Sequence, residues 1–185
     1  MRGCQGCELF RFATQAVFGE GITSAPLVLV GEQPGDQEDL QGRPFVGPAG
    51  QLLDRALQQA RIAREQIYVT NAVKHFKFTR EGKRRIHQKP GGTEISACRP
   101  WLEAELEAVR PKLIVCLGAT ASQSVLGRQV RIQKERGVFL PHRSGAEVMI
   151  TIHPSALLRL PTAEQKEREF EHLVQDLQHA AARVA

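Results

Sequence analysis

Four short apolar runs, separated by segments with helical spacing, constrain the fold of this chain most strongly. The runs are 27–31, 67–73, 113–117 and 148–152, and they are rich in Leu, Val and Ile. Runs of this length and composition are typical of buried strands. Strands that alternate with helices form βαβ units, in which helices cover both faces of a mainly parallel sheet. The pattern therefore predicts an α/β protein with a three-layer α/β/α architecture.

Apolar side chains recur at helical spacing between and after these runs. The predicted helices are 52–60, 102–109, 119–126 and 163–184. Segment 130–140 is expected to add an irregular hairpin. Because no repeat or linker divides the chain, we expect residues 1–185 to form a single domain.

The composition excludes several classes of protein. The chain has 185 residues, of which 42% are hydrophobic and 24% charged, and no apolar run approaches the roughly 20 residues needed to cross a bilayer. Its start lacks the apolar segment of a secretory signal, and four cysteines are too few for a disulfide scaffold. We therefore expect a cytoplasmic protein with no membrane partner.

The positive charge is concentrated in residues 74–89, which we call the basic segment. The whole chain has a net charge of +5, whereas this segment alone carries seven Lys and Arg against Glu81, a net +6. A local excess of this kind favours an anionic partner such as nucleic acid, the alternative being a solvated surface loop. The segment ends in Lys83-Arg84-Arg85-Ile86-His87. His87 is either one more phosphate contact or a group that acts on bound nucleic acid.

Unusual polar residues follow the predicted strands at their carboxyl ends, where open parallel sheets bind ligands. The first strand leads into Gly31-Glu32-Gln33-Pro34-Gly35, the second includes Asn71, and the fourth leads into His153-Pro154-Ser155. The glycine-rich turn has neither the Walker A nor the G-x-G-x-x-G spacing, so it does not favour a nucleotide cofactor. This convergence predicts one site at the strand ends.

Three of these residues have both a structural and a functional interpretation. Phe45, in the Gly/Pro-rich segment 42–50, is either a core side chain or a stacking platform for a flat ligand. His153 either belongs to a helix-entry turn capped by Ser155 or donates a hydrogen bond to a developing negative charge. Asn71 either caps a turn or reads one edge of a base.

The cysteines indicate a metal centre. Cys4 and Cys7 form a Cys-x-x-Cys pair, which binds zinc or an iron–sulfur cluster or acts as a redox pair. The pair does not follow a strand of a βαβ unit, so a thioredoxin-like site is not favoured. Cys98 is a further candidate ligand. Spacing leaves the last ligand open between Cys116, which lies in an apolar run, and a nearby histidine.

Taken together, these motifs resemble the uracil-DNA glycosylases of the iron–sulfur, family 4-related group, and most closely its UdgX branch. The resemblance covers nearly the whole chain and is carried by Cys4-x-x-Cys7, 14–19, 31–35, 42–50, 70–78, 83–87, 97–102 and 153–159. The Glu32-Gln33 pair and segment 83–87 are the features that look specific to UdgX.

The resemblance implies a [4Fe–4S] cluster. Usual members of the group carry cysteine after Asn-x-Val-Lys, where this chain has His75. The implied ligands are therefore Cys4, Cys7, His75 and Cys98, with Cys116 left as a core thiol. Histidine ligands of iron–sulfur clusters are known from Rieske centres.

The resemblance also implies cleavage of the N-glycosidic bond of deoxyuridine in DNA by a monomeric enzyme. The uracil would be presented in a single strand or flipped out of a duplex. Phe45 would stack on uracil, Asn71 would pair with its polar edge, and His153 would stabilise the departing anion. Gln33 and Asp36 complete the implied substrate-binding set.

The UdgX branch further implies that His87 bonds to C1′ of the abasic sugar, while Glu32 orients the imidazole and accepts its proton. The product would be a dead-end covalent adduct, so the reaction would be single-turnover. Lys83, Arg84 and Arg85 would hold the flanking phosphates. The alternatives are a conventional multiple-turnover uracil-DNA glycosylase, a non-enzymatic metal-containing nucleic-acid-binding module, and a redox iron–sulfur protein.

Overall fold

The computed structural model describes residues 3–185, and six strands of this range form one sheet in the order β1-β3-β2-β6-β8-β7. Its parallel centre consists of β3 (Tyr68–Asn71), β2 (Leu27–Gly31), β6 (Leu113–Leu117) and β8 (Glu147–Thr151). The antiparallel edge strands are β1 (Glu20–Gly21) and β7 (Phe139–Pro141). All four predicted strands are confirmed, and those at 27–31 and 113–117 have the predicted ends.

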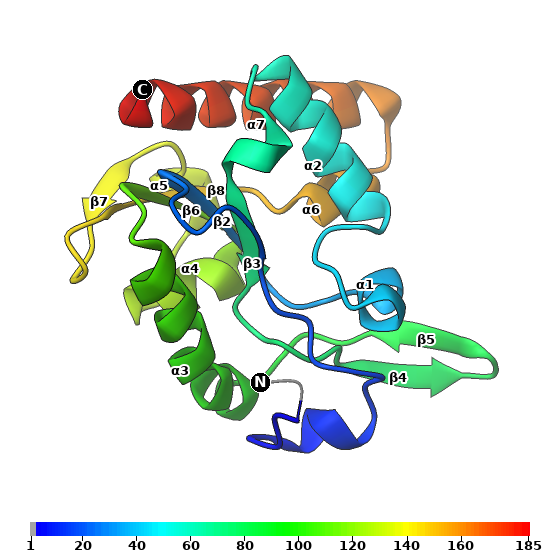
Figure 1. Cartoon of the computed structure of the whole chain (residues 1–185). Coiled ribbons are helices and arrows are strands. Elements are labelled where there is room, and N and C mark those ends of the chain that lie inside the picture. Colours follow the sequence, from blue (N-terminus) through cyan, green and yellow to red (C-terminus); the bar gives the residue numbers. More distant parts are fainter. Residues whose placement is uncertain (1–2) are drawn as a thin grey trace.

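Helices cover both faces of the sheet (Figure 1). On one face, α2 (Pro48–Gln59) and α7 (Ala163–Val184) pack against Leu27 and Leu29 of β2. On the other, α3 (Gly92–Val109) and α4 (Ala119–Leu126) pack against Val28 and Val30. Successive side chains of a strand point to opposite faces, so a strand covered on both sides is apolar throughout. The predicted three-layer α/β/α architecture is confirmed.

The helix α3 begins well before the predicted segment 102–109. Only its second half faces the sheet, whereas the first half buries Ile95 and Cys98 against Leu9 and Val73. The carboxylate of Glu94 accepts a hydrogen bond from the backbone N–H of Gly91 and so caps the start of the helix. The apolar spacing that predicted the helix therefore marked only the part that packs on the sheet.

The prediction of a hairpin within residues 130–140 is wrong. The segment forms a single helical turn, α5 (Ile132–Glu135), and then β7, whose antiparallel partner is β8. Arg136 bridges to Ile150 and pairs with Asp176 of α7. These contacts hold the segment against the sheet edge and prevent it from pairing with itself.

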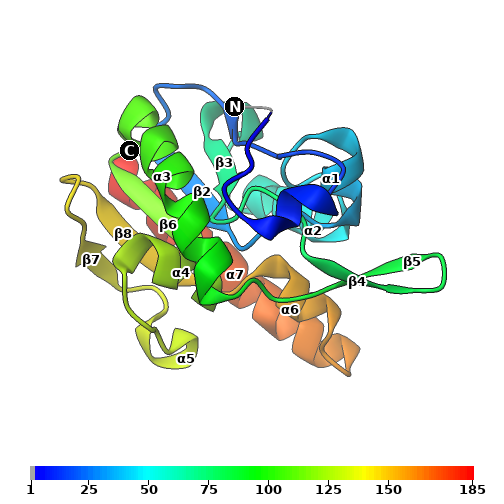
Figure 2. The ribbon, with the colours of Figure 1, turned by 90° about the horizontal axis from the view of Figure 1, so that it is seen from below.

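The basic segment forms a regular hairpin rather than a loop. Its strands are β4 (Phe78–Glu81) and β5 (Arg84–His87), which pair with each other and project from the body of the molecule (Figures 1 and 2). Gly82 in the connecting turn has a φ of +60°, a conformation that glycine adopts without steric cost. The register places Phe78 opposite His87, so their side chains share one face of the hairpin.

Short helices complete the described chain. They are η1 (Glu8–Arg11), α1 (Asp36–Gln41), η2 (Arg64–Gln66) and α6 (Pro154–Leu158). Within residues 3–185, no helix combines the length and the apolar composition that a membrane crossing requires.

Candidate active site

The carboxyl ends of β2, β3 and β8 bring Glu32, Asn71 and His153 to one edge of the sheet. Side chains of this site approach the backbone most closely at Gly31, the last residue of β2. A Cβ atom there would lie 2.4 Å from Asn71 Oδ1 and 2.6 Å from Phe45 Cζ. Only glycine therefore lets the Asn71 amide and the Phe45 ring lie against the strand end. We call Glu32, Phe45, Asn71 and His153 the strand-end cluster.

Phe45 enters this cluster in a strained conformation. Its φ is +56°, in the left-handed region that bulky residues rarely adopt. The ring is 6% exposed and packs in the hydrophobic core, and it also stacks on the imidazole of His153 with centroids 6.1 Å apart. Phe45 is thus a core side chain, as one interpretation predicted, whose ring also borders the candidate site.

His153 caps the start of α6, which confirms the helix-entry turn, although the cap is His153 rather than Ser155. The backbone N–H of Ser155 donates to His153 Nδ1 over 3.1 Å. Because Nδ1 accepts, the proton of the neutral ring resides on Nε2. Burial, together with smaller contributions from Arg159 and His87, lowers the pKa of His153 to about 4. At pH 7 the ring is therefore a neutral donor through Nε2–H.

Glu32 lies between His87 of the hairpin and Thr120 of α4. Its Oε1 atom is 3.4 Å from His87 Nε2, and its Oε2 atom accepts a hydrogen bond from the Thr120 hydroxyl. The His87 side chain is 47% exposed, so a ligand at the strand ends has access to it. Burial lowers the pKa of His87, Glu32 opposes this, and Arg159 adds to the lowering. The imidazole is consequently neutral at pH 7.

Aromatic rings support His87 at the base of the hairpin. The ring of Phe76 lies 6.2 Å from that of His87 and 5.1 Å from that of Phe78. The guanidinium of Arg85 lies over both phenylalanine rings, at 5.5 Å from Phe76 and 5.1 Å from Phe78. The His87 ring therefore packs against a group of side chains that contact one another, which restricts its movement.

The predicted DNA contact Arg85 points toward the body of the protein. Its Nε atom is 2.5 Å from Asp36, its Nη1 atom is 2.6 Å from Asp39, and the side chain is only 11% exposed. Asp36, predicted to bind substrate, is engaged in this pair. Arg85 and Asp36 therefore join the hairpin to α1, while the DNA and substrate contacts that the sequence predicted for them stay predictions.

Three of the seven cations of the basic segment form ion pairs within the protein. These pairs are Lys74–Glu105, Lys77–Glu94 and Arg85 with Asp36 and Asp39. The other four cations, Arg80, Lys83, Arg84 and Lys89, are exposed. The charge available to an anionic partner is therefore smaller than the sequence indicated, and it includes the predicted DNA contacts Lys83 and Arg84.

Gln33 anchors the base of the hairpin. Its Nε2 atom donates to the carbonyls of Lys77 and Gln88 over 3.3 and 2.9 Å, and its Oε1 atom accepts from the backbone N–H of Lys77 over 3.0 Å. The side chain is therefore occupied, and only the backbone of Gln33 is left for the predicted substrate role.

The sequence analysis did not identify Glu38, Thr120 or Arg159. Glu38 accepts hydrogen bonds from the backbone N–H groups of Gly35 and Gly47, and so joins the two glycine-rich loops. Arg159 lies near enough to His87 and His153 to lower the pKa of both. The acidic first turn after Gly35 was a detectable signal for Glu38, whereas the contacts of Thr120 and Arg159 depend on distant segments.

The predicted metal ligands Cys4, Cys7 and Cys98 interact where the N-terminal segment meets α3. Burial raises the pKa of the Cys7 thiol, to which Cys4 adds, while a hydrogen bond with Cys98 lowers it. The indole N–H of Trp101 donates to Cys4 Sγ over 3.2 Å, and the backbone N–H of Lys74 donates to Cys98 Sγ over 3.4 Å. Hydrogen bonds to sulfur of this kind tune iron–sulfur clusters.

His75 and Cys116 have different surroundings. His75 is 4% exposed, and its Nδ1 atom has no hydrogen-bond partner within residues 3–185, which is unfavourable unless a ligand takes it up. Cys116 is fully buried in β6 on the sheet face that α3 and α4 cover. By their chemistry, the three cysteine sulfurs and the Nδ1 nitrogen of His75 are donors of the kind that an iron–sulfur group takes. Within residues 3–185, no three His, Cys, Asp or Glu side chains are grouped closely enough for a single metal ion.

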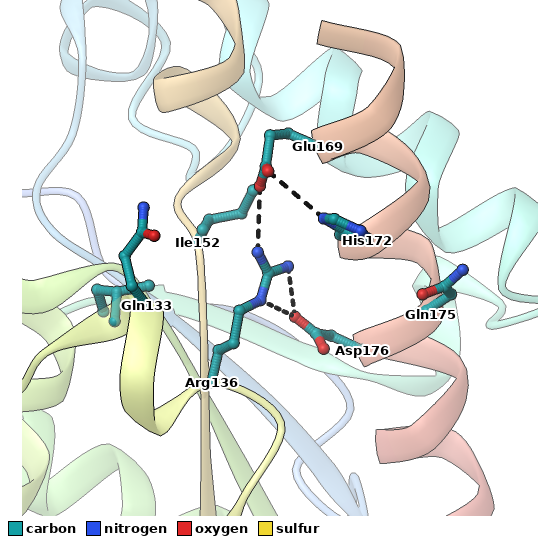
Figure 3. Close-up of a pocket in the computed structure, with 8 residues that line it drawn as sticks. Gln133, Arg136, Ile152, Glu169, His172, Gln175 and Asp176 are labelled. Atoms are coloured by element: carbon teal, nitrogen blue, oxygen red, sulfur yellow. Dashed lines mark hydrogen bonds and ion pairs between the residues drawn. The ribbon is translucent and has the colours of Figure 1, made fainter. Parts of the chain in front are cut away.

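A polar cavity of about 380 Å³ lies between α5, α7 and the end of β8 (Figure 3). Arg136 in its wall pairs with Glu169 at 3.1 Å and with Asp176 at 2.8 Å. Because two carboxylates hold the guanidinium, the cavity is poorly suited to a phosphate-bearing ligand. Its charged groups attach the α5 segment to α7.

A sequence profile described as the uracil DNA glycosylase superfamily matches residues 18–178. The chain belongs to this superfamily. Similar proteins include the Type-4 uracil-DNA glycosylase of Thermotoga maritima, 42% identical over 160 residues that cover 86% of this chain and 80% of the relative. Those of Saccharolobus solfataricus and Archaeoglobus fulgidus are 37% and 36% identical, over 87% and 92% of this chain and 75% and 86% of their own lengths.

Membership of the superfamily confirms the prediction of a uracil-DNA glycosylase with a matching α/β domain. The matched range includes the strand-end cluster and His87, whereas Cys4 and Cys7 precede it. An enzyme family favours catalysis over the binding-module and redox-protein alternatives.

Proposed function

We propose that this uracil-DNA glycosylase is of the UdgX type, which excises uracil from DNA and then bonds His87 to C1′ of the abasic sugar. The observation that carries the proposal is the 3.4 Å distance between His87 Nε2 and Glu32, at the strand ends that bear Asn71 and His153. A nucleophile beside a group that can take its proton is the arrangement that covalent catalysis requires.

Substrate binding begins with a uracil nucleotide outside the base stack, either in a single strand or flipped out of a duplex. The ring of Phe45 stacks on uracil, and the amide of Asn71 offers a donor and an acceptor that match the polar edge of uracil but not that of cytosine. The exposed Lys83 and Arg84 hold flanking phosphates. A single copy of the chain suffices for these contacts.

Cleavage of the C1′–N1 bond sends both bonding electrons to uracil and leaves an oxocarbenium-like sugar. His153 donates from Nε2–H to the uracil anion as charge develops on it. A pKa of about 4 keeps the ring in its neutral form, and the Ser155 N–H fixes its orientation. Donors held in place toward a developing negative charge are among the largest contributors to enzymatic rates.

Capture follows at the same carbon. One ring nitrogen of neutral His87 bonds to C1′ through its lone pair, and the proton on the other nitrogen passes to Glu32. The Thr120 hydroxyl holds Glu32 in place. Because His87 takes the position from which water would attack, the reaction ends in a covalent adduct after one turnover.

Incubation with a uracil-containing single-stranded oligonucleotide, followed by denaturing electrophoresis, tests the proposal. We expect a heat-stable, slower band with the native protein and none with His87→Ala. His87→Ser should release uracil repeatedly, because water takes the vacated place. A thymine oligonucleotide is the matched control. Release of many equivalents of uracil by the native protein would contradict covalent capture.

We further propose that Cys4, Cys7, His75 and Cys98 hold a [4Fe–4S] cluster, which joins the N-terminal segment and the hairpin base to α3. The cluster supplies a structural crosslink and takes no part in base excision. The buried Nδ1 of His75 and the N–H groups directed at Cys4 and Cys98 support this assignment. We expect His75→Ala to lose iron and Cys116→Ser to keep it; the reverse result would overturn the ligand set.

A conventional multiple-turnover glycosylase is the second candidate, favoured by the Type-4 relatives at 36–42% identity. In that case His87 contacts DNA without bonding to it. The number of uracils released per protein molecule distinguishes the two functions, since capture limits it to one.

A further inference from the structure

A fully buried ammonium group lies behind the strand-end cluster. The side chain of Lys74 has no exposed surface, and its Nζ atom donates to Thr70 Oγ1 and to the Asn71 carbonyl, each over 2.7 Å, and to Glu105 Oε2 over 2.6 Å. A lysine ammonium has three N–H donors, so all of them are used. The side chain folds back onto the last two residues of β3, the strand that precedes it.

Glu105, which pairs with this ammonium, collects further hydrogen bonds from its position on α3. Its Oε2 atom also accepts from the Thr70 hydroxyl over 2.7 Å, and its Oε1 atom accepts from the Gly19 backbone N–H over 2.7 Å. The carboxylate is about 10% exposed. One carboxylate therefore joins β3, α3 and the segment that leads into β1.

Stability alone does not explain such a pair. Removing two charges from water is costly, and apolar side chains of similar volume often stabilise a protein as well or better. A buried pair does, however, define positions more narrowly than apolar packing, because each hydrogen bond requires a particular geometry. The question is then which group is being held.

The group in question is Asn71. Lys74 holds its carbonyl, and on the other side of the same peptide the Ala72 N–H donates to the Gly31 carbonyl over 2.9 Å. With both sides of this peptide bonded, the backbone from which the Asn71 side chain extends is fixed, and its amide lies against Gly31 beside Phe45. We propose that Lys74 and Glu105 are positioning residues that orient the Asn71 amide for uracil, an inference that rests on the proposed role of Asn71.

A double-mutant cycle on the single-turnover rate of uracil excision tests this inference. Asn71→Ala should slow excision, and Lys74→Met should slow it by about 10- to 100-fold, the range expected when a substrate-positioning group is displaced. In the Asn71→Ala background, Lys74→Met should have no further effect. A general folding defect would instead multiply with the loss caused by Asn71→Ala.

Two further variants distinguish loss of positioning from a folding defect. In Lys74→Met/Glu105→Met, both charges are replaced by apolar groups, so no uncompensated charge remains, and the same loss of rate is expected. Leu106→Ala, the neighbouring core residue on α3, should lower the melting temperature without changing the excision rate.

The outcomes separate the two claims. Additive losses in the cycle, or full activity of the double apolar variant, would overturn the positioning role while leaving the proposed function intact. A native rate for Asn71→Ala would overturn the proposed role of Asn71 and, with it, this inference.

Discussion

Asn71 and His153 are held by the main sheet, whereas His87 is carried by a hairpin that projects from it. Asn71 is 3% exposed and bonded on both sides of its peptide, and His153 is fixed by the first turn of α6. His87 is 47% exposed. Its position depends on packing against Phe76 and on the two ion pairs that the nearby Arg85 forms with α1. The first region is rigid by burial, the second by a small number of side-chain contacts.

Under the proposed function, this difference predicts that base excision and sugar capture are separable. The groups proposed for excision belong to the sheet edge, and the group proposed for capture reaches that edge from outside. Changes in the sheet edge should affect both steps, because capture requires an excised base, whereas changes in the hairpin should affect capture more than excision.

The largest effect is expected at the sheet edge. His153→Ala removes the Nε2–H donor and should slow uracil excision by about 100- to 1000-fold, with adduct formation slowed equally. Single-turnover assays of free uracil and of adduct measure both. Ser155→Ala loses the hydroxyl 2.8 Å from His153 Nδ1 but keeps the backbone N–H that donates to the same atom; it is the control and should cost far less. Excision at the native rate by His153→Ala would show that the proposed role of His153 in excision is wrong.

Acidification should separate the two regions without a mutation. Burial lowers the pKa of His87 below its ordinary value of 6.5, so the nucleophile is neutral near pH 7 and becomes protonated as the pH falls through its pKa in the folded protein. Adduct yield should then drop, by about tenfold per pH unit once the pH is well below the pKa of His87. Excision should persist toward pH 4, where His153 titrates.

A parallel loss of uracil release and adduct between pH 7 and about pH 4 would show that one titration controls both steps. His87→Ser provides the control: it forms no adduct, and its excision should still persist well below pH 6.5, although loss of His87 removes one of the smaller causes that lower the pKa of His153.

The hairpin anchor is the next test. Arg85→Met removes both ion pairs to α1, and we expect adduct formation to slow by about tenfold while excision changes less. Arg183→Met, which breaks an exposed pair with Glu147, should leave both rates unchanged. Equal slowing of both steps by Arg85→Met would mean that the hairpin also serves excision.

The smallest effect is expected at the exposed hairpin cations. Lys83→Ala should weaken binding of uracil-containing DNA severalfold and reduce the dependence of log affinity on log salt by about one unit. Titrations at several salt concentrations measure this change. Lys112→Ala, at the amino end of β6, is the matched control, and an equal effect there would argue against a specific DNA surface on the hairpin.

The buried central strands were predictable because their residue types alone nearly suffice to identify them. A strand covered on both faces must be apolar throughout, so β2 and β6 are visible as continuous runs of Leu, Val and Ile. The β4–β5 hairpin was not predicted because its strands are mostly polar and half exposed. Pairing between the strands, packing on Phe76 and the contacts of Gln33 and Arg85 with distant segments make that segment regular.

By itself, the sequence determined the α/β architecture and the set of polar residues at the strand ends. Both follow from local patterns, since burial selects apolar runs and parallel strands direct their carboxyl ends to one edge. The tertiary structure decided which charges remain available. Arg84 and Arg85 are adjacent in sequence, yet one is exposed and the other pairs with α1, because ion pairs depend on the distance between segments far apart in the chain.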